Sequence, residues 1–201
     1  MMTITYKVKN GVYVNMTNRC PCACTFCLRH NAAGVYGSEP LWLDREPTVK
    51  EVCDSIDTWC LSELDEIVFC GYGEPTERLD DLLEVAKYVK SKSDIKIRIN
   101  TNGLSDLIHG ERTAPKLKGL IDTVSVSLNA TNAEDYLKVV RPKFGIGSYD
   151  AMLEFTKDCV NFVPNVVMTV VDVVTSPEEQ EKSRKICKEL GATLRIRPFE
   201  G

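Results

Sequence analysis

No run of residues in this sequence is apolar enough to cross a membrane as a helix. A helix that spans the bilayer needs about eighteen or more mostly apolar residues. The first residues, "MMTITYKVKNG", also lack the apolar centre of a secretion signal. Hydrophobic residues make up 43% of the chain and charged residues 27%, as in ordinary globular proteins. We therefore expect a cytoplasmic protein without a membrane partner.

The chain also has no excess of positive charge, few histidines and no low-complexity tract. Its formal net charge is −4, which disfavours a general nucleic-acid binder, because such proteins usually present a basic face. Only 2 histidines, His30 and His109, are available as metal ligands. No internal repeat or linker divides the 201 residues. We therefore expect one domain over residues 1–201.

Cysteine, by contrast, is plentiful. The chain has 9 cysteines, and Cys20, Cys22, Cys24 and Cys27 all lie in "RCPCACTFCLR". Cys20, Cys24 and Cys27 have the spacing CxxxCxxC. Thiolates bind soft metals, chiefly zinc and iron–sulfur clusters. Three thiolates on a short loop can hold three irons of a 4Fe–4S cluster and leave the fourth iron open to another ligand.

Zinc is the rival interpretation of this loop. Structural zinc usually takes four ligands as two separated pairs, but no second Cys-Xaa-Xaa-Cys or histidine pair follows. His30 is close enough in sequence to bind a metal, although a lone histidine in a polar loop is more often solvated. A non-catalytic zinc or iron–sulfur module therefore stays open as the alternative to a catalytic centre.

The other cysteines do not form a second group. A reducing cytosol disfavours disulfides, and each of these residues falls inside an apolar pattern. We expect them to be small buried hydrophobic residues. They are Cys53, Cys60, Cys70, Cys159 and Cys187.

Strand-like and helix-like segments alternate along the chain. Two β-rich runs flank Asn10-Gly11, a strong hairpin signal. Strands that alternate with amphipathic helices indicate a parallel sheet covered by helices, and six of them do not complete an eight-stranded barrel. We expect an α/β fold, a partial (β/α)6 TIM-like barrel with an N-terminal β-hairpin. Its six strands are predicted at residues 12–17, 66–71, 95–100, 122–128, 165–174 and 193–199.

Capping residues mark the ends of several predicted helices. A serine or threonine followed three residues later by glutamate is the pattern of a capping box. This pattern places helix starts at Thr48, Thr131 and Ser176, and Gly191 suits the position just after a helix end.

Polar or small residues follow nearly every predicted strand at the same end. Since ligands of α/β proteins bind at the carboxyl ends of the strands, these segments are expected to form one site. Each motif alone would be typical of an ordinary turn. The segments are the cysteine loop, "GYGEPT" (71–76), "NTNG" (100–103), "SVSLNA" (125–130) and "RIRPF" (195–199).

Taken in order, these segments resemble the radical S-adenosylmethionine (radical SAM) superfamily. The motifs are CxxxCxxC with Phe26 before its last cysteine, then GxGEP, NTNG and SxSLNA, and the resemblance spans residues 12–199. The short chain and its "VVRP" and "RIRPF" segments look most like the small TatD-associated radical SAM proteins. That likeness implies no known substrate.

The resemblance implies two cofactors, a 4Fe–4S cluster and S-adenosylmethionine (SAM). Cys20, Cys24 and Cys27 would ligate the cluster, and the amino and carboxylate groups of SAM would chelate its open iron. Cys22 would be a spare thiol.

Further residues would hold SAM itself. Tyr72, Gly73 and Glu74 stand in place of the family's Gly-Gly-Glu and would contact the methionine ammonium, mainly through backbone carbonyls and Glu74. Tyr72 departs from the family pattern, which matters little if only its backbone is used. Ser127 and Asn129, with Asn100 or Asn102, match positions that hold the ribose or the methionine carboxylate, and backbone from Arg197 to Phe199 would meet adenine.

The implied reaction belongs mainly to the cofactors, which the protein binds and orients. One electron from a flavodoxin or ferredoxin would reduce the cluster, and SAM would be cleaved to methionine and a 5′-deoxyadenosyl radical. That radical would abstract hydrogen from the substrate.

The substrate stays open between a protein, such as a glycyl-radical enzyme, and a small pterin-like or nucleoside compound. Loop 30–44, which includes Tyr36 and Trp42, or a partner such as a second copy of the chain could cover the site. Arg141 is a candidate to bind an anionic group in the cavity.

Overall fold

Seven strands form one continuous sheet in the computed structural model, which describes residues 2–30 and 37–198. The strands lie in the order of the sequence, with β1 and β7 at the two edges. β1 and β2 are antiparallel, and every later pair of neighbours is parallel. The predicted hairpin and parallel sheet are confirmed. The strands are β1 (Thr5–Val8), β2 (Gly11–Val14), β3 (Glu66–Phe69), β4 (Lys96–Thr101), β5 (Thr123–Ser127), β6 (Asn165–Val171) and β7 (Thr193–Arg197).

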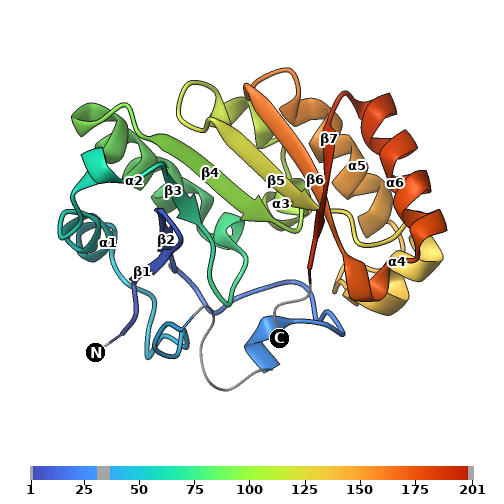
Figure 1. Cartoon of the computed structure of the whole chain (residues 1–201), viewed down its shortest axis with the longest axis horizontal. Helices are drawn as coiled ribbons and strands as arrows, with labels where there is room; N and C mark the ends of the chain where they lie inside the picture. Colours follow the sequence, from blue (N-terminus) through green and yellow to red (C-terminus); the bar gives the residue numbers. More distant parts are fainter. Residues whose placement is uncertain (1, 31–36, 199–201) are drawn as a thin grey trace.

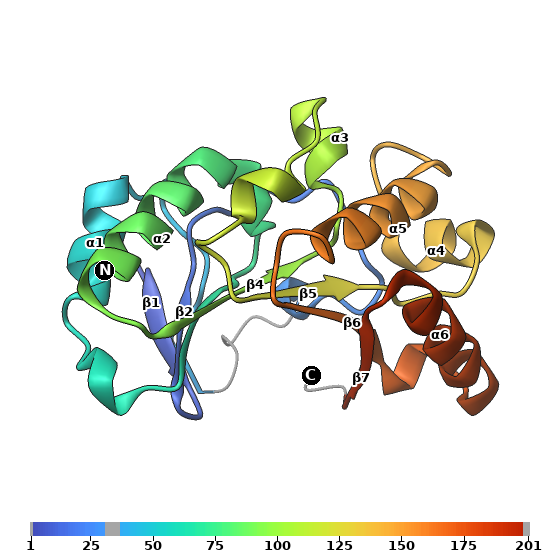
Figure 2. The ribbon, with the colours of Figure 1, turned by 90° about the horizontal axis from the view of Figure 1, so that it is seen from above.

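The α-helices lie on the outer side of the curved sheet, and the cysteine loop lies on its concave side (Figures 1 and 2). The strands at the two edges, β1 and β7, are not paired with each other in the described residues. The fold is therefore an open α/β half-barrel, as predicted. The described helices are α1 (Val49–Ile56), α2 (Leu79–Lys92), α3 (Ser105–His109), α4 (Ala133–Val140), α5 (Ser148–Cys159) and α6 (Pro177–Leu190).

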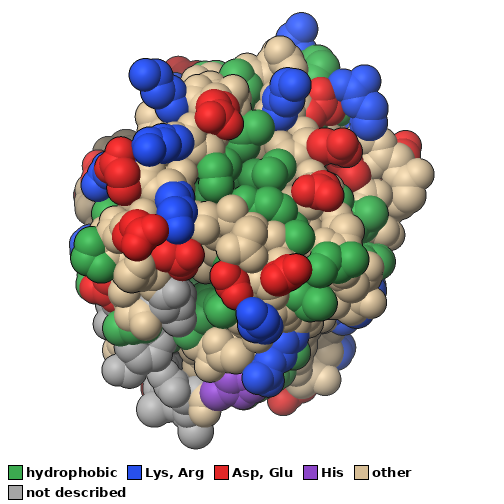
Figure 3. Space-filling view, turned by 90° about the vertical axis from the view of Figure 1, so that its right-hand side faces the viewer, with side chains coloured by type: hydrophobic (Ala, Val, Ile, Leu, Met, Phe, Trp, Pro, Cys, Tyr) green, Lys and Arg blue, Asp and Glu red, His purple; other side chains and the backbone are tan. Residues whose placement is uncertain are grey.

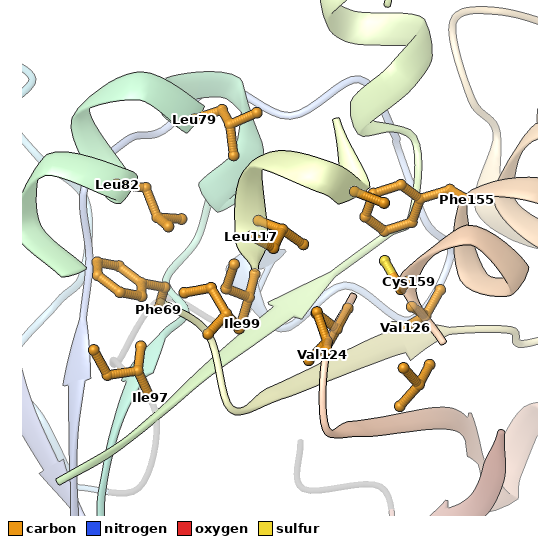
Figure 4. Packing of buried hydrophobic residues seen from close by; sticks show 14 of the residues in the cluster. Phe69, Leu79, Leu82, Ile97, Ile99, Leu117, Val124, Val126, Phe155 and Cys159 are labelled. Atoms are coloured by element: carbon orange, nitrogen blue, oxygen red, sulfur yellow. The ribbon is translucent and has the colours of Figure 1, made fainter. Parts of the chain in front are cut away.

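The hydrophobic core fills the space between the sheet and the helices (Figure 4). Ile97 and Ile99 of β4 point into it, while Arg98 and Asn100 alternate onto the opposite, concave face. Successive side chains of a strand point to opposite faces of the sheet. The concave face of the sheet is consequently polar enough to hold a charged ligand. Core residues labelled in Figure 4 are Phe69, Leu79, Leu82, Leu117, Val124, Val126, Phe155 and Cys159.

At the end of the molecule that carries β7 and α6, both apolar and charged side chains reach the surface. Figure 3 shows apolar side chains gathered near the centre of this side, with acidic and basic side chains around them.

None of the helices in the described residues combines the length and apolarity required to span a bilayer.

The hairpin turn lies one residue earlier than predicted. Val8 pairs with Gly11, so the turn residues are Lys9 and Asn10, and Lys9 adopts a φ of 54°. Gly11 belongs to β2 instead, where a Cβ would lie only 3.3 Å from the Cγ of Glu66 on β3. The glycine therefore serves the approach of two strands and not the turn.

Several other local predictions need correction. α4 is capped by Asn132, whose side chain accepts from the Asp135 amide, and not by Thr131. β6 ends at Val171 and β7 at Arg197, earlier than predicted. Cys60 is exposed, because α1 ends before it. The caps predicted at Thr48, Ser176 and Gly191 are confirmed.

Replacing Ile99 with alanine should lower the free energy of unfolding by about 2–5 kcal/mol, because it leaves a cavity in the core between the sheet and the helices. Ile99 is 1% exposed. Lys185, on the exposed side of α6, offers a matched control: Lys185→Ala should change stability by less than about 0.5 kcal/mol. Urea denaturation measures both, and equal effects would contradict this description of the core.

Candidate functional site

A cavity of about 430 Å³ lies on the concave side of the sheet, at the ends of the strands. It brings together segments that are far apart in the sequence. Most of the predicted site residues line it, although the sequence motifs alone could not show how they meet. From the prediction these are Cys20, Cys24, Cys27, Tyr72, Gly73, Glu74, Asn100, Asn102, Ser127 and Arg197.

The cysteine loop is fixed by hydrogen bonds to the end of α4. The amide of Ala23 donates to the carbonyl of Val140 at 3.2 Å, and the amide of Thr25 donates to the carbonyl of Val139 at 2.9 Å. Cys22 also forms an isolated antiparallel bridge with Pro142. The "VVRP" segment therefore supports the loop from behind, a role that its sequence did not reveal.

The four cysteines of the loop fall into two groups. Cys20, Cys24 and Cys27 line the cavity, whereas Cys22 is not part of its lining and is 4% exposed. Hydrogen bonds to Cys20 and Cys24 raise the pKa of the Cys22 thiol, and bonds from Cys22 lower the pKa values of Cys20 and Cys24. Burial raises the pKa of Cys27. The Cys22 sulfur also accepts from Nδ2 of Asn102 at 3.6 Å, so Cys22 is packed behind the cavity lining.

The donor set fits an iron–sulfur cluster. None of these cysteines forms a disulfide, and thiolates are the usual ligands of such clusters. Among the described residues, no three or more His, Cys, Asp or Glu side chains are grouped so as to hold a metal ion. A cubane cluster binds each cysteine through a different iron, so its ligands need not converge on one point.

The GYGE segment packs directly against the chain that enters the cysteine loop. A Cβ on Gly71 would lie 2.0 Å from Oδ1 of Asn15, and a Cβ on Gly73 would lie 2.2 Å from the Thr17 carbonyl oxygen. The amide of Glu74 donates to the carbonyl of Arg19 at 2.8 Å. Both glycines are thus required for packing between the two segments.

Glu74 joins the ends of β3 and β4. Its carboxylate is buried and accepts from Thr76, from the Thr101 hydroxyl at 2.7 Å and from the Asn102 amide at 2.7 Å. Burial raises the pKa of Glu74, and these hydrogen bonds oppose that rise. The side chain therefore holds the site together, whatever ligand it also meets.

Some residues named from the sequence are not part of the cavity lining. Asn129 is buried and does not line the cavity; it adopts a φ of 56°, and its Oδ1 has no hydrogen-bond partner. Arg141 is exposed at the end of α4, where its Nε donates to the Lys138 carbonyl. Phe199 and Tyr36 lie outside the described residues. Trp42 is 48% exposed and packs edge-on against Tyr72.

The cavity also contains residues that were not assigned a role from the sequence. Arg98 and Cys70 line it from outside the predicted segments, and Arg195 and Thr101 line it from within "RIRPF" and "NTNG". Cys70 had been expected in the core, but it sits just past the end of β3, where the chain turns onto the concave face. The period of two in "KIRIN" and "LRIR" was the available signal for both arginines, because it places alternate residues on one face.

Gly73→Ala should weaken both the fold and the metal site, because the new methyl group would collide with the carbonyls of Thr17 and Arg19. We expect a loss of more than about 1 kcal/mol in the free energy of unfolding and a lower iron content after reconstitution. Gly147→Ala is the control, since nothing lies within 4 Å of a Cβ there. Normal stability and iron loading of Gly73→Ala would contradict the packing argument.

Comparison with known proteins supports the fold and the order of these motifs. A family model described as the radical SAM superfamily matches residues 14–190. A search of curated proteins finds no match.

Solved structures resemble the chain at low sequence identity. Streptococcus suis SuiB, bound to its precursor peptide SuiA, aligns with a TM-score of 0.67 and 15% identity over 93% of this chain and 38% of SuiB. A radical SAM methyltransferase from Sphaerobacter thermophilus aligns with a TM-score of 0.61 and 16% identity over 98% of this chain and 69% of its own.

The FeFe-hydrogenase maturase HydG from Carboxydothermus hydrogenoformans gives a TM-score of 0.60 and 16% identity over 94% of this chain and 44% of HydG. The chain thus spans less than half the length of SuiB and HydG, and these likenesses establish the fold alone. Because the family model covers most of the sequence, the chain belongs to the radical SAM superfamily.

Proposed function

We propose that this protein is a radical SAM enzyme in which a 4Fe–4S cluster, reduced by one electron, cleaves SAM to methionine and a 5′-deoxyadenosyl radical that abstracts hydrogen from a substrate. The observation that carries the proposal is the shared cavity. Cys20, Cys24 and Cys27 line it together with the GYGE segment and the ends of β4 and β5. Superfamily membership supports enzymatic activity in general.

In this proposal Cys20, Cys24 and Cys27 are the cluster ligands. Their thiols face the cavity, and the loop is held from behind by α4. Cys22 is not a ligand in this proposal, because it is buried outside the cavity lining, where its sulfur accepts from Nδ2 of Asn102 at 3.6 Å. The loop therefore supplies three thiolates and leaves one iron for a ligand that is not protein.

The residues around the cysteines would bind SAM. We assign backbone of Tyr72 and Gly73, with Glu74, to the methionine end, and Asn100, Asn102 and Ser127 to its carboxylate or ribose. The Tyr72 side chain packs in a small cluster with Tyr6, Val8 and Leu41, which leaves its backbone to face the ligand. Asn129 would act by shaping the wall, since it is buried outside the cavity lining. Backbone near Arg197 is assigned to adenine.

We propose that the protein needs an electron donor and a partner or loop that closes the open side of the cavity. A flavodoxin or ferredoxin is the proposed electron donor. The open side of the half-barrel would be closed by loop 30–44, a second copy of the chain or a macromolecular substrate. Residues 31–36 of that loop lie outside the described residues.

The competing function is a non-catalytic zinc or iron–sulfur module. Such a module would bind metal without cleaving SAM. It leaves the shared cavity of GYGE, NTNG and Ser127 without a purpose, whereas SAM binding explains it.

Anaerobic reconstitution should give about four irons per chain, and reduction with SAM present should release 5′-deoxyadenosine. Cys20→Ala, Cys24→Ala and Cys27→Ala should each abolish that release, because each removes a thiolate ligand. Iron analysis and chromatography of the products measure both.

Cys22→Ala is the matched control, and it should keep the cluster and the cleavage. A loss of metal in Cys22→Ala would indicate that four thiols hold the metal. A fully loaded, reducible cluster that binds SAM but never cleaves it would rule out the catalytic proposal.

A further inference from the structure

Two arginines of β7 point into the cavity without a partner. Arg195 and Arg197 both line it, and the side chain of neither forms an ion pair or hydrogen bond with another described residue. Arg195 is exposed and Arg197 half-buried, and Nε of Arg197 is buried and has no hydrogen-bond partner. Because burying an unpaired donor is costly, the position of Arg197 is best explained by an anion bound beside it, within reach of Arg195 on the same face of β7.

A third arginine of the cavity, Arg98, has its charge and its hydrogen-bond donors paired within the protein. Arg98 of β4 forms a two-pronged ion pair with Glu66, with Nε to Oε2 at 2.9 Å and Nη2 to Oε1 at 2.5 Å. It also donates to Asn100 and to the Tyr13 hydroxyl. The cation of Arg98 is thus neutralised within the protein, whereas those of Arg195 and Arg197 are not.

The charge of the cavity differs from that of the chain. The chain carries a net charge of −4, yet the cavity lining holds more basic than acidic residues. Two of its acidic groups are already engaged, Glu66 with Arg98 and Glu74 with hydrogen-bond donors of the protein. SAM brings a sulfonium cation, which does not balance unpaired arginines.

The arginines also border a smaller adjoining cavity of about 100 Å³ that none of the cysteine-loop thiols lines. Its walls combine the cations with aromatic and aliphatic side chains, and the rings of Tyr6 and Tyr13 lie 5.5 Å apart. A molecule that extends from the main cavity into this space would meet the two arginines at its charged end. The lining is Tyr6, Tyr13, Leu28, Leu41, Cys70, Gly71, Tyr72, Arg98, Asn100, Arg195 and Arg197.

We propose that Arg195 and Arg197 bind a carboxylate or phosphate group of the substrate and so select an anionic small molecule. This rests on the proposed function, since it deepens the description of the same cavity. Arginine suits the task because its planar donors bind carboxylate and phosphate in pairs. The two residues are spaced by two along β7, which places their side chains on one face.

The test uses the reconstituted holoenzyme with SAM bound, so that the open iron is occupied, and two probes, inorganic phosphate for phosphate and succinate for carboxylate, measured by anaerobic calorimetry. Arg195→Gln and Arg197→Gln should each weaken binding of the preferred probe about ten-fold or more, because a charge-assisted hydrogen bond is lost. Arg195→Lys and Arg197→Lys, which keep the charge, should recover part of it. The probe that binds more tightly identifies the anion class.

Arg184→Gln is the control, because Arg184 is a surface cation of α6 whose side chain is 55% exposed. It should leave probe binding unchanged, and Arg195→Gln should leave the affinity for SAM unchanged. Equal probe binding by the wild type and both Gln variants would overturn the proposal. A loss of SAM affinity with unchanged probe binding would overturn it too, by assigning the arginines to the carboxylate of SAM.

The outcome is separable from that of the proposed function. If the wild type binds the probes through Arg195 and Arg197 but never forms 5′-deoxyadenosine, the anion site stands and the radical chemistry falls. If 5′-deoxyadenosine forms while neither probe binds, the radical chemistry stands and the anion site falls.

Discussion

The close contact between the GYGE segment and the chain that enters the cysteine loop is the constraint on which the site depends. Two glycines allow backbone to touch backbone there, and the Glu74 amide donates to the Arg19 carbonyl. The Glu74 carboxylate then ties this contact to the end of β4 through Thr101 and Asn102. On the other side, α4 holds the loop. The backbone of the cysteine loop is therefore held from both sides.

The open half-barrel explains why the interior can be polar. Helices bury the apolar side of the strands, so stability rests on one face of the sheet, and the concave face is free to carry Arg98, Asn100 and Arg195. The charged and ionisable groups of the concave face lie in separate places. The thiols gather at the cysteine loop, Arg98 is neutralised by Glu66, and the unpaired cations lie on β7 at the edge of the sheet. Under our two proposals, this separation would give the cavity a cluster-binding end at the cysteine loop and an anion-binding end at β7.

Local patterns predicted the elements well, because alternation and capping depend on near neighbours. The hairpin, the order of strands and helices, and the caps at Thr48 and Ser176 follow from such patterns. Properties set by distant neighbours were missed. The role of Gly11 depends on Glu66, and the buried position of Asn129 depends on how β5 ends. The motifs located the site, and the CxxxCxxC spacing already set Cys22 apart as a spare thiol, in agreement with its absence from the cavity lining.

The central claim is a four-iron cluster held by three cysteines, with one iron open to SAM. Mössbauer spectroscopy of the ⁵⁷Fe-reconstituted protein, with and without SAM, tests it most directly. The account predicts a 4Fe–4S spectrum in which SAM changes the signal of one iron and leaves three unchanged. A spectrum that SAM does not alter at any iron would contradict the account.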